Sequence, residues 1–199
     1  MTILPRREKY VQFTRPFFSF SVSGLIHKSN KKNLKTIADL AIKSNLSCGV
    51  YEQSNTFMSM SKKRDVRNIH WLYERIIANR SNFLHTHDEV IKKVKNEKFV
   101  FLQEEPRNAF LASLDCDLTL LYDPNFYIFG QYAIALPYDS PYLTPFNIAL
   151  ERMEKEGFLT VLKAKYFLHT KCSSGYRIYS KNIILTILFL LSILNLFIF

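Results

Sequence analysis

A cluster of potential metal ligands lies at residues 85–88, which read His-Thr-His-Asp. Imidazole and carboxylate groups are common zinc ligands. However, His85 and His87 are one residue apart at the start of a predicted helix, so their side chains should point to different sides. Thr86 and Glu89 have the spacing of a capping box, which satisfies backbone groups where a helix begins. The sequence therefore predicts a helix start here and no metal site.

No grouping of nucleophile, base and acid typical of a hydrolase is present. The chain has many serines but no Gly-x-Ser-x-Gly sequence, and its five glycines form no phosphate-binding loop. Cys48 lies in a predicted strand, where a thiol more often serves in packing than in catalysis. The sequence thus predicts a protein that is not an enzyme and that needs no cofactor.

Three polar positions suit the binding of a charged small molecule. Residues 54–56 read Ser-Asn-Thr and begin a predicted helix, and helix N-termini bind anions. The guanidinium of Arg7 could hold a carboxylate through two hydrogen bonds. Glu104 ends a predicted strand, at the edge where α/β sheets bind ligands. Each has an alternative role: residues 54–56 could simply cap the helix, Arg7 could be a surface arginine, and Glu104 could be a solvated loop acid. The neighbouring Glu105 competes with Glu104 for the ligand-facing position and could equally be a solvated loop acid.

Positive charge is spread along the chain. There are 27 basic and 17 acidic residues, giving a net charge of +10. The basic pairs, at residues 31–32, 62–64 and 92–93, alternate with acids, and no nucleic-acid-binding motif accompanies them. We therefore predict solvated surfaces and no nucleic-acid partner.

The last residues are strongly hydrophobic. Residues 183–199 carry no charge, and only Thr186, Ser192 and Asn195 among them are polar. A bilayer-spanning helix needs about 20 apolar residues, so this run is slightly short. Because it is apolar on all faces, we predict a membrane segment preceded by a juxtamembrane stretch at residues 173–182. Whether the segment crosses the whole bilayer is left open.

Other features bear on the compartment. Cys48, Cys116 and Cys172 permit one disulfide and one free thiol. Asn45 and Asn79 begin glycosylation sequons, which suit an extracellular surface. No signal peptide opens the chain, so we expect a further N-terminal part in the complete protein.

The periodicity of the chain alternates between strands and helices. Residues 10–26 are predicted to be extended and broken at Pro16, and further strands are predicted at residues 47–51, 99–102, 117–122 and 131–136. Helices are predicted at residues 36–43, 68–77, 86–94 and 144–157, with another starting at residue 54. This alternation favours an α/β fold with a largely parallel sheet.

The last of these helices has the clearest ends. Thr144 is predicted as its N-cap, Pro145 as its first helical residue and Gly157 as a left-handed residue at its end.

Short motifs follow one another in a fixed order through residues 1–172. A first group of motifs, within residues 2–28, reads TILPRRE from Thr2 and VQFTRPF from Val11. A second group, within residues 34–172, reads IADLA from Ile37, KFVFLQE from Lys98, AIALP from Ala133 and LHTKC from Leu168. In this order they resemble the ligand-binding domain of ionotropic glutamate receptors. The resemblance implies a type II periplasmic-binding-protein-like fold, in which a ligand lies between two lobes.

The resemblance also implies roles for five residues. Thr2 and Arg7 would hold the α-carboxylate of an amino-acid ligand, and Glu104 would bind its ammonium group. Asn55 and Thr56 would receive the distal carboxylate. Asn55 stands where the family has serine, and Ser54 where it has glycine, and the larger Asn55 is expected to shorten the pocket. In the same family two cysteines matching Cys116 and Cys172 form a disulfide, which would leave Cys48 free.

The resemblance divides the chain into five parts. Residues 1–28 would end the first lobe, and residues 36–172 would form the second lobe. Residues 29–35 would be a linker, where relatives have the three membrane segments of the pore. The juxtamembrane stretch at residues 173–182 and a transmembrane helix at residues 183–199 would follow.

The function implied is that of a partial ionotropic glutamate receptor-like subunit. It would lie in the cell membrane with its ligand-binding part outside, bind glutamate or a similar amino acid, and gate a cation channel together with other subunits. Two alternatives remain open. One is a chemosensory ionotropic receptor for another small molecule, and the other is a channel-less membrane-anchored regulator of full-length subunits.

Overall fold

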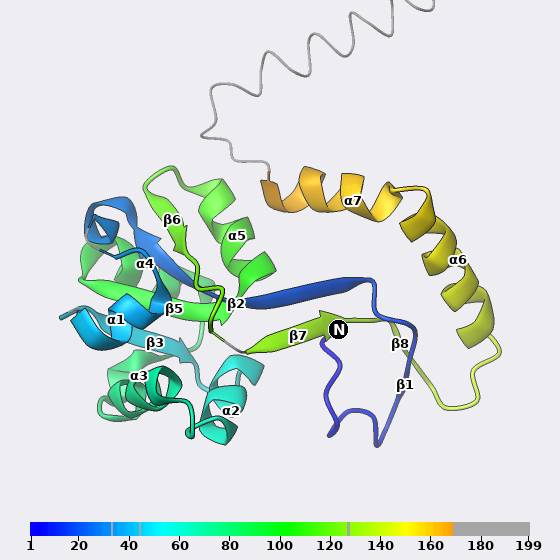
Figure 1. Ribbon diagram of the computed structural model, residues 1–199, viewed down its shortest axis with the longest axis horizontal. Helices are drawn as coiled ribbons and strands as arrows, with labels where there is room; N and C mark the ends of the chain where they lie inside the picture. The colour runs from blue at the N-terminus through cyan, green and yellow to red at the C-terminus, as the bar shows by residue number, and fades with distance from the viewer. Residues whose placement is uncertain (33, 44, 127, 169–199) are drawn as a thin grey trace, which may run out of the picture.

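The structure is a computed structural model that describes residues 1–168 except 33, 44 and 127. The chain forms a broad body around a β-sheet and a narrower arm beside it (Figure 1). The long strand β2 (Phe18–His27) runs through both parts. Cys172, the juxtamembrane stretch and the predicted membrane segment at residues 183–199 lie outside the described residues. Within the described part, no helix has the length and hydrophobicity needed to cross a membrane.

The main sheet has the strand order β4-β3-β5-β2-β6, with β7 also paired to β2. Its other strands are β3 (Ser47–Tyr51), β4 (Phe83–Leu84), β5 (Phe99–Glu104), β6 (Leu118–Leu121) and β7 (Phe129–Tyr132). The α/β class is confirmed, but the prediction of a largely parallel sheet is wrong. β3 is parallel to β4 and β5, whereas β2 is antiparallel to β5, β6 and β7. β2 runs from the arm into the broad body, opposite in direction to β5, and its pairings form the antiparallel half of the sheet.

Helices cover both faces of this sheet (Figure 1). One core cluster packs the sheet against α1 (Ile37–Lys43), α2 (Asn55–Lys62) and α3 (Arg67–Ile77). A second cluster packs the other face against α4 (His87–Asn96) and α5 (Glu105–Leu114). All residues of β5 are buried, as the continuous apolar run of Phe99–Leu102 predicts for a strand covered on both sides.

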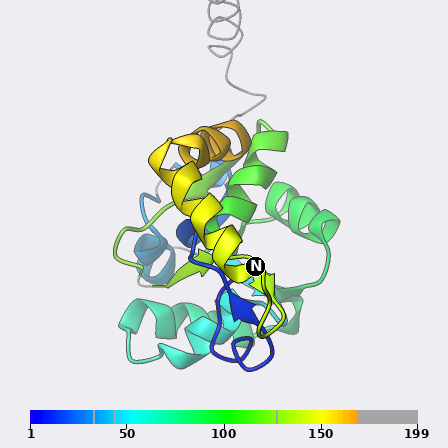
Figure 2. The same ribbon diagram turned by 90° about the vertical axis from the view of Figure 1, so that its right-hand side faces the viewer.

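The arm contains the N-terminal segment and the last helices. β1 (Gln12–Phe13) pairs antiparallel with β8 (Ala135–Leu136), while α6 (Leu143–Lys155), α7 (Phe158–Lys163) and a π-helical turn η3 (Ala164–Leu168) complete it. Figure 2, which looks onto the arm, shows α6 lying across it between α7 and the N-terminal segment. The strand predicted at residues 131–136 is thus divided between β7 and β8.

Local signals in the sequence fix several element ends. The capping box of Thr86 and Glu89 opens α4, and the left-handed Gly157 (φ 74°) separates α6 from α7, both as predicted. The prediction of Thr144 as N-cap is wrong by two residues. α6 begins at Leu143 with Tyr142 as N-cap, so Pro145 lies within the first turn, where a missing N–H is tolerated.

The stretch predicted to end the first lobe contains β2, which pairs with strands of the main sheet. Its buried Leu25 and Ile26 lie opposite Phe101 and Val100 of β5. A short 3-10 turn, η1 (Lys28–Lys31), then leads toward α1. The division of the chain into lobes and linker stays a prediction.

Candidate functional site

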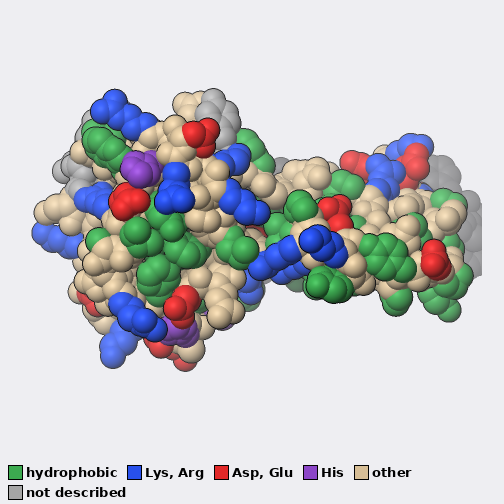
Figure 3. Space-filling model, turned by 90° about the horizontal axis from the view of Figure 1, so that it is seen from below, with side chains coloured by type: hydrophobic (Ala, Val, Ile, Leu, Met, Phe, Trp, Pro, Cys, Tyr) green, Lys and Arg blue, Asp and Glu red, His purple; other side chains and the backbone are tan. Residues whose placement is uncertain are grey.

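A cavity of about 690 Å³ lies where the N-terminal segment of the arm meets the broad body. Its walls come from the N-terminal segment, the end of β3 and start of α2, the end of β4 and the residue after it, the end of β5 and start of α5, and β7. These contribute Met1, Thr2, Arg6, Arg7, Tyr51, Glu52, Gln53, Ser54, Asn55, Leu84, His85, Gln103, Glu104, Arg107 and Tyr132. Seen from below, Lys and Arg side chains gather where the body meets the arm (Figure 3).

Glu104 is the centre of a hydrogen-bond network in this cavity. It ends β5 and is only 7% exposed. Its Oε1 accepts from the Thr2 hydroxyl at 3.0 Å and from the Asn55 amide at 3.4 Å. Its Oε2 accepts from the Tyr132 hydroxyl at 2.6 Å. A carboxylate can accept about four hydrogen bonds, so Glu104 retains capacity for a ligand's N–H group.

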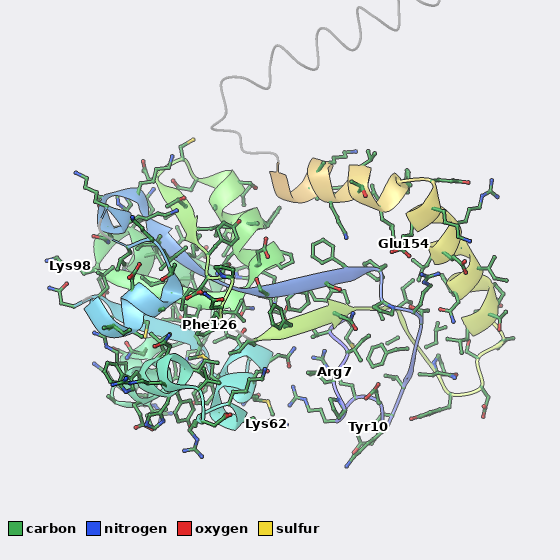
Figure 4. All side chains as sticks on the ribbon, viewed as in Figure 1. Arg7, Tyr10, Lys62, Lys98, Phe126 and Glu154 are labelled. Carbon is green, nitrogen blue, oxygen red and sulfur yellow. The ribbon has the colours of Figure 1, made fainter. Side chains whose placement is uncertain are left out.

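The N-terminal segment brings Thr2 and Arg7 to the same cavity. Thr2 is buried and forms an antiparallel bridge with Tyr132. A turn closed by the bond from the Arg7 N–H to the Leu4 carbonyl reverses the chain, and the Arg7 guanidinium donates to the Thr2 carbonyl at 2.7 Å. Figure 4 labels Arg7 on this segment, beneath β7. No carboxylate among the described residues pairs with Arg7, so the remaining N–H groups of its fork are open to a ligand.

The start of α2 forms the facing wall. Ser54 caps the helix by accepting from the Phe57 N–H at 3.2 Å. Asn55 accepts from Arg6 at 3.1 Å in addition to donating to Glu104. Thr56 behaves differently: it is 2% exposed, its hydroxyl has no hydrogen-bond partner among the described residues, and it does not line the cavity. The structure thus brings Thr2, Arg7, Asn55 and Glu104 together and places the Thr56 side chain behind the wall.

Sequence reasoning missed several cavity residues. Tyr132 lies in a predicted strand, and nothing local indicates that its hydroxyl reaches Glu104. Burial raises the pKa of Tyr132 strongly, and the hydrogen bond to Glu104 raises it further, so the phenol remains a donor. Arg6, Arg107 and Gln103 were also missed, because their spacing in the sequence follows no binding motif.

The cavity carries more positive than negative charge. Three guanidinium groups line it, those of Arg6, Arg7 and Arg107, against the carboxylates of Glu52 and Glu104. Glu52 in turn lies 3.8 Å from His85. The site has no nucleophile paired with a base. Its guanidinium, carboxylate and hydroxyl groups are those that bind a small zwitterionic or acidic molecule.

The two histidines considered as metal ligands diverge in the structure. His85 approaches Glu52, whereas Nδ1 of His87 lies 2.5 Å from the Tyr51 hydroxyl. The described residues contain no group of three or more potential ligands able to hold a metal ion.

Cys48 is free and buried, as the predicted pairing of the other two cysteines requires. Burial raises its pKa to about 12. Since Cys172 lies outside the described residues, its disulfide with Cys116 stays a prediction. Both sequon asparagines, Asn45 and Asn79, are exposed, and their glycosylation also stays a prediction.

Comparisons with known proteins show which proteins resemble this chain in sequence and fold. No protein-family model matches the chain. A probable glutamate receptor of Lithobates berlandieri is 27% identical over 143 residues, covering 71% of this chain and 28% of the receptor. The human kainate 5 ionotropic glutamate receptor is 27% identical over 139 residues, covering 67% of this chain and 14% of that protein. The chain thus spans less than a third of the length of these relatives.

Among solved structures, the Drosophila muscle GluRIIB complex with glutamate has the same fold. The TM-score is 0.72 at 22% identity, and the match covers 83% of this chain and 65% of that one. The matched proteins are receptors rather than enzymes, in agreement with the sequence prediction. The chain is therefore similar in sequence to ionotropic glutamate receptors and has the α/β fold of their ligand-binding domain.

Proposed function

We propose that this chain binds an α-amino acid in the cavity between the N-terminal segment and the broad body. The observation that carries the proposal is the meeting of Arg7 and Glu104 in one cavity. The unpaired guanidinium of Arg7 matches an α-carboxylate, and the free acceptor capacity of Glu104 matches an ammonium group. Thr2 lies between them and donates to Glu104.

Glutamate is the first ligand to test, because the structural neighbour is a complex with glutamate. The similarity to glutamate receptors supports a role as a receptor-like subunit at the cell membrane, with this domain on the extracellular side. Family resemblance places pore segments where η1 joins β2 to α1, and this connection has only nine residues, 28–36. Gating of a cation channel would therefore act through other receptor subunits.

The experiment is to compare glutamate with glutarate, which lacks the amino group. Isothermal titration calorimetry on the full 199-residue chain, purified in mild detergent, should give measurable binding of glutamate and much weaker binding of glutarate. Glu104→Gln should reduce this preference, because a neutral amide attracts an ammonium group less than a carboxylate does. Equal binding of both compounds would contradict recognition of a zwitterion, and binding of neither would contradict the proposed ligand class.

The proposed dependence on other subunits has its own test. Patch-clamp recording from cells that express only this chain should show no glutamate-gated current, and co-expressed receptor subunits should co-purify with it. A robust current from the chain alone would contradict this part of the proposal.

A further inference from the structure

The start of α2, where family resemblance places the distal carboxylate of a ligand, is partly engaged by the protein. Ser54 accepts from the Phe57 N–H, and the Asn55 amide is shared between Arg6 and Glu104. The Thr56 hydroxyl is buried away from the cavity. If the ligand is an amino acid, as proposed above, the Asn55 amide is already engaged and the Thr56 hydroxyl lies out of reach of an acidic group on its side chain. Of these three side chains, Ser54 keeps its O–H to donate, because its cap bond uses only the oxygen as acceptor.

Another cationic group of the cavity is unpaired. Arg107 lies in the first turn of α5, is exposed, and lines the cavity. It has no carboxylate at ion-pair distance among residues the structure describes. Its charge acts on the hydroxyls of two other cavity residues, Tyr51 and Tyr132. Burial raises the pKa of both phenols, and the positive charge of Arg107 lowers it. The positive end of the α5 dipole adds to this field.

Gln103 offers a second unpaired group on the same wall. It is 3% exposed, lines the cavity, and its side-chain carbonyl has no hydrogen-bond partner. The unpartnered atom is an acceptor, so an acidic group of a ligand can meet this residue only through its NH₂ group. By rotating its terminal amide, Gln103 can present its NH₂ group to an acceptor.

Tyr51 also lines the cavity, and the charge of Arg107 acts on its hydroxyl. Its ring packs against Phe101 of β5, with the ring centroids 4.8 Å apart. Glu52 is the opposing charge on this side of the cavity, and it lies near His85, which offsets it when protonated. Arg107 also acts on the Tyr132 hydroxyl, which donates to Glu104, so its charge reaches the part of the cavity that holds Glu104.

We propose that Arg107, assisted by Gln103, recognises an acidic group on the side chain of the bound amino acid. Arg107 is then a specificity-determining residue that selects acidic over neutral amino acids, a role that the resemblance would give to Asn55 and Thr56. The inference rests on the proposed amino-acid site but concerns a different residue of it from Arg7 and Glu104.

The test measures dissociation constants of glutamate and glutamine by calorimetry on the full chain and its variants. Glutamine has the same backbone groups and length but no side-chain charge. Arg107→Met should weaken glutamate binding about tenfold or more, since a charge-assisted hydrogen bond is lost, while glutamine binding should change by no more than about threefold. Retained glutamine binding also shows that the variant is folded.

Three further variants separate the outcomes. Arg107→Lys should keep part of the preference for glutamate, and Arg80→Met, at an exposed arginine outside the cavity, should leave both affinities unchanged. Thr56→Val should also change neither. Three results would each overturn the role of Arg107. In the first, Arg107→Met weakens the binding of glutamate and glutamine equally; in the second, it changes neither affinity. In the third, Thr56→Val selectively loses glutamate binding. If the unaltered chain binds neither amino acid, the proposed function itself fails, and this inference fails with it.

Discussion

The Tyr132 hydroxyl donates to Oε2 of Glu104 at 2.6 Å and ties β7 to the end of β5. Glu104 is nearly buried, so each donor to its charge matters for stability as well as for binding. Tyr132→Phe removes this donor and should lower the free energy of unfolding by about 1.5–3 kcal/mol. Chemical denaturation of the full chain measures the change. Tyr142→Phe, at a side chain that is 63% exposed, is the control and should have little effect. Equal stability of the two variants would show that the Tyr132–Glu104 bond contributes nothing.

Cys48 should be unreactive in the folded protein. Its side chain is fully buried, and its pKa is raised to about 12, so the reactive thiolate is scarce near neutral pH. Iodoacetamide should modify Cys48 only after denaturation, which peptide mass spectrometry can measure. Rapid labelling of the native chain at this residue would contradict the placement of β3 in the core.

Asp115 should make stability depend on pH in the acid range. Its hydrogen bond from Lys95, at 2.7 Å, is the main cause that lowers its pKa. A carboxyl group with a lowered folded-state pKa contributes stability above its unfolded pKa and loses that contribution as pH falls through the folded value. Asp115→Asn should therefore be less stable than the unaltered chain at neutral pH, and the difference should shrink on acidification. Asp65→Asn, at an exposed aspartate for which the described structure shows no ion pair, is the control. A difference for Asp115→Asn that is constant with pH would contradict the ion pair.

Gly49 in β3 is required by close packing. A Cβ added there would lie 2.2 Å from the Asn82 carbonyl oxygen and 2.6 Å from the Phe99 ring. Backbone atoms cannot move aside cheaply, so Gly49→Ala should destabilise the protein by about 1–3 kcal/mol. The control is Gly157→Asn, where the glycine is left-handed with open space around it. Asparagine tolerates that conformation, so this change should cost less. Thermal unfolding compares the two, and a Gly49→Ala variant as stable as the unaltered chain would refute the packing.

Local features of the fold could be predicted because their signals are local. The capping box of Thr86 and Glu89, the buried run in β5 and the left-handed Gly157 each depend on a few neighbouring residues. The direction of β2 in the sheet could not be predicted in this way. Its pairing with β5 joins residues about 80 positions apart, such as Val22 and Glu104, and no local pattern specifies it.

The site divides in the same way. Thr2, Arg7 and Glu104 could be proposed because each matches a motif, but the pattern at residues 54–56 did not reveal that the Thr56 side chain faces the core. A helix start of this type exposes some residues and buries others, and which ones depends on how α2 packs. Tyr132 and Arg107 reach the cavity only because β7 and α5 meet the N-terminal segment in three dimensions.

The most direct test of the central claim is the binding of glutamate to the full chain and to Arg7→Lys, measured by isothermal titration calorimetry. Lysine keeps the charge but loses the planar fork, so we expect binding to the unaltered chain and at least about tenfold weaker binding to the variant. Arg80→Lys is the matched control and should bind as the unaltered chain does. Undiminished binding by Arg7→Lys would contradict an amino-acid site built on Arg7, and so would the absence of binding by the unaltered chain.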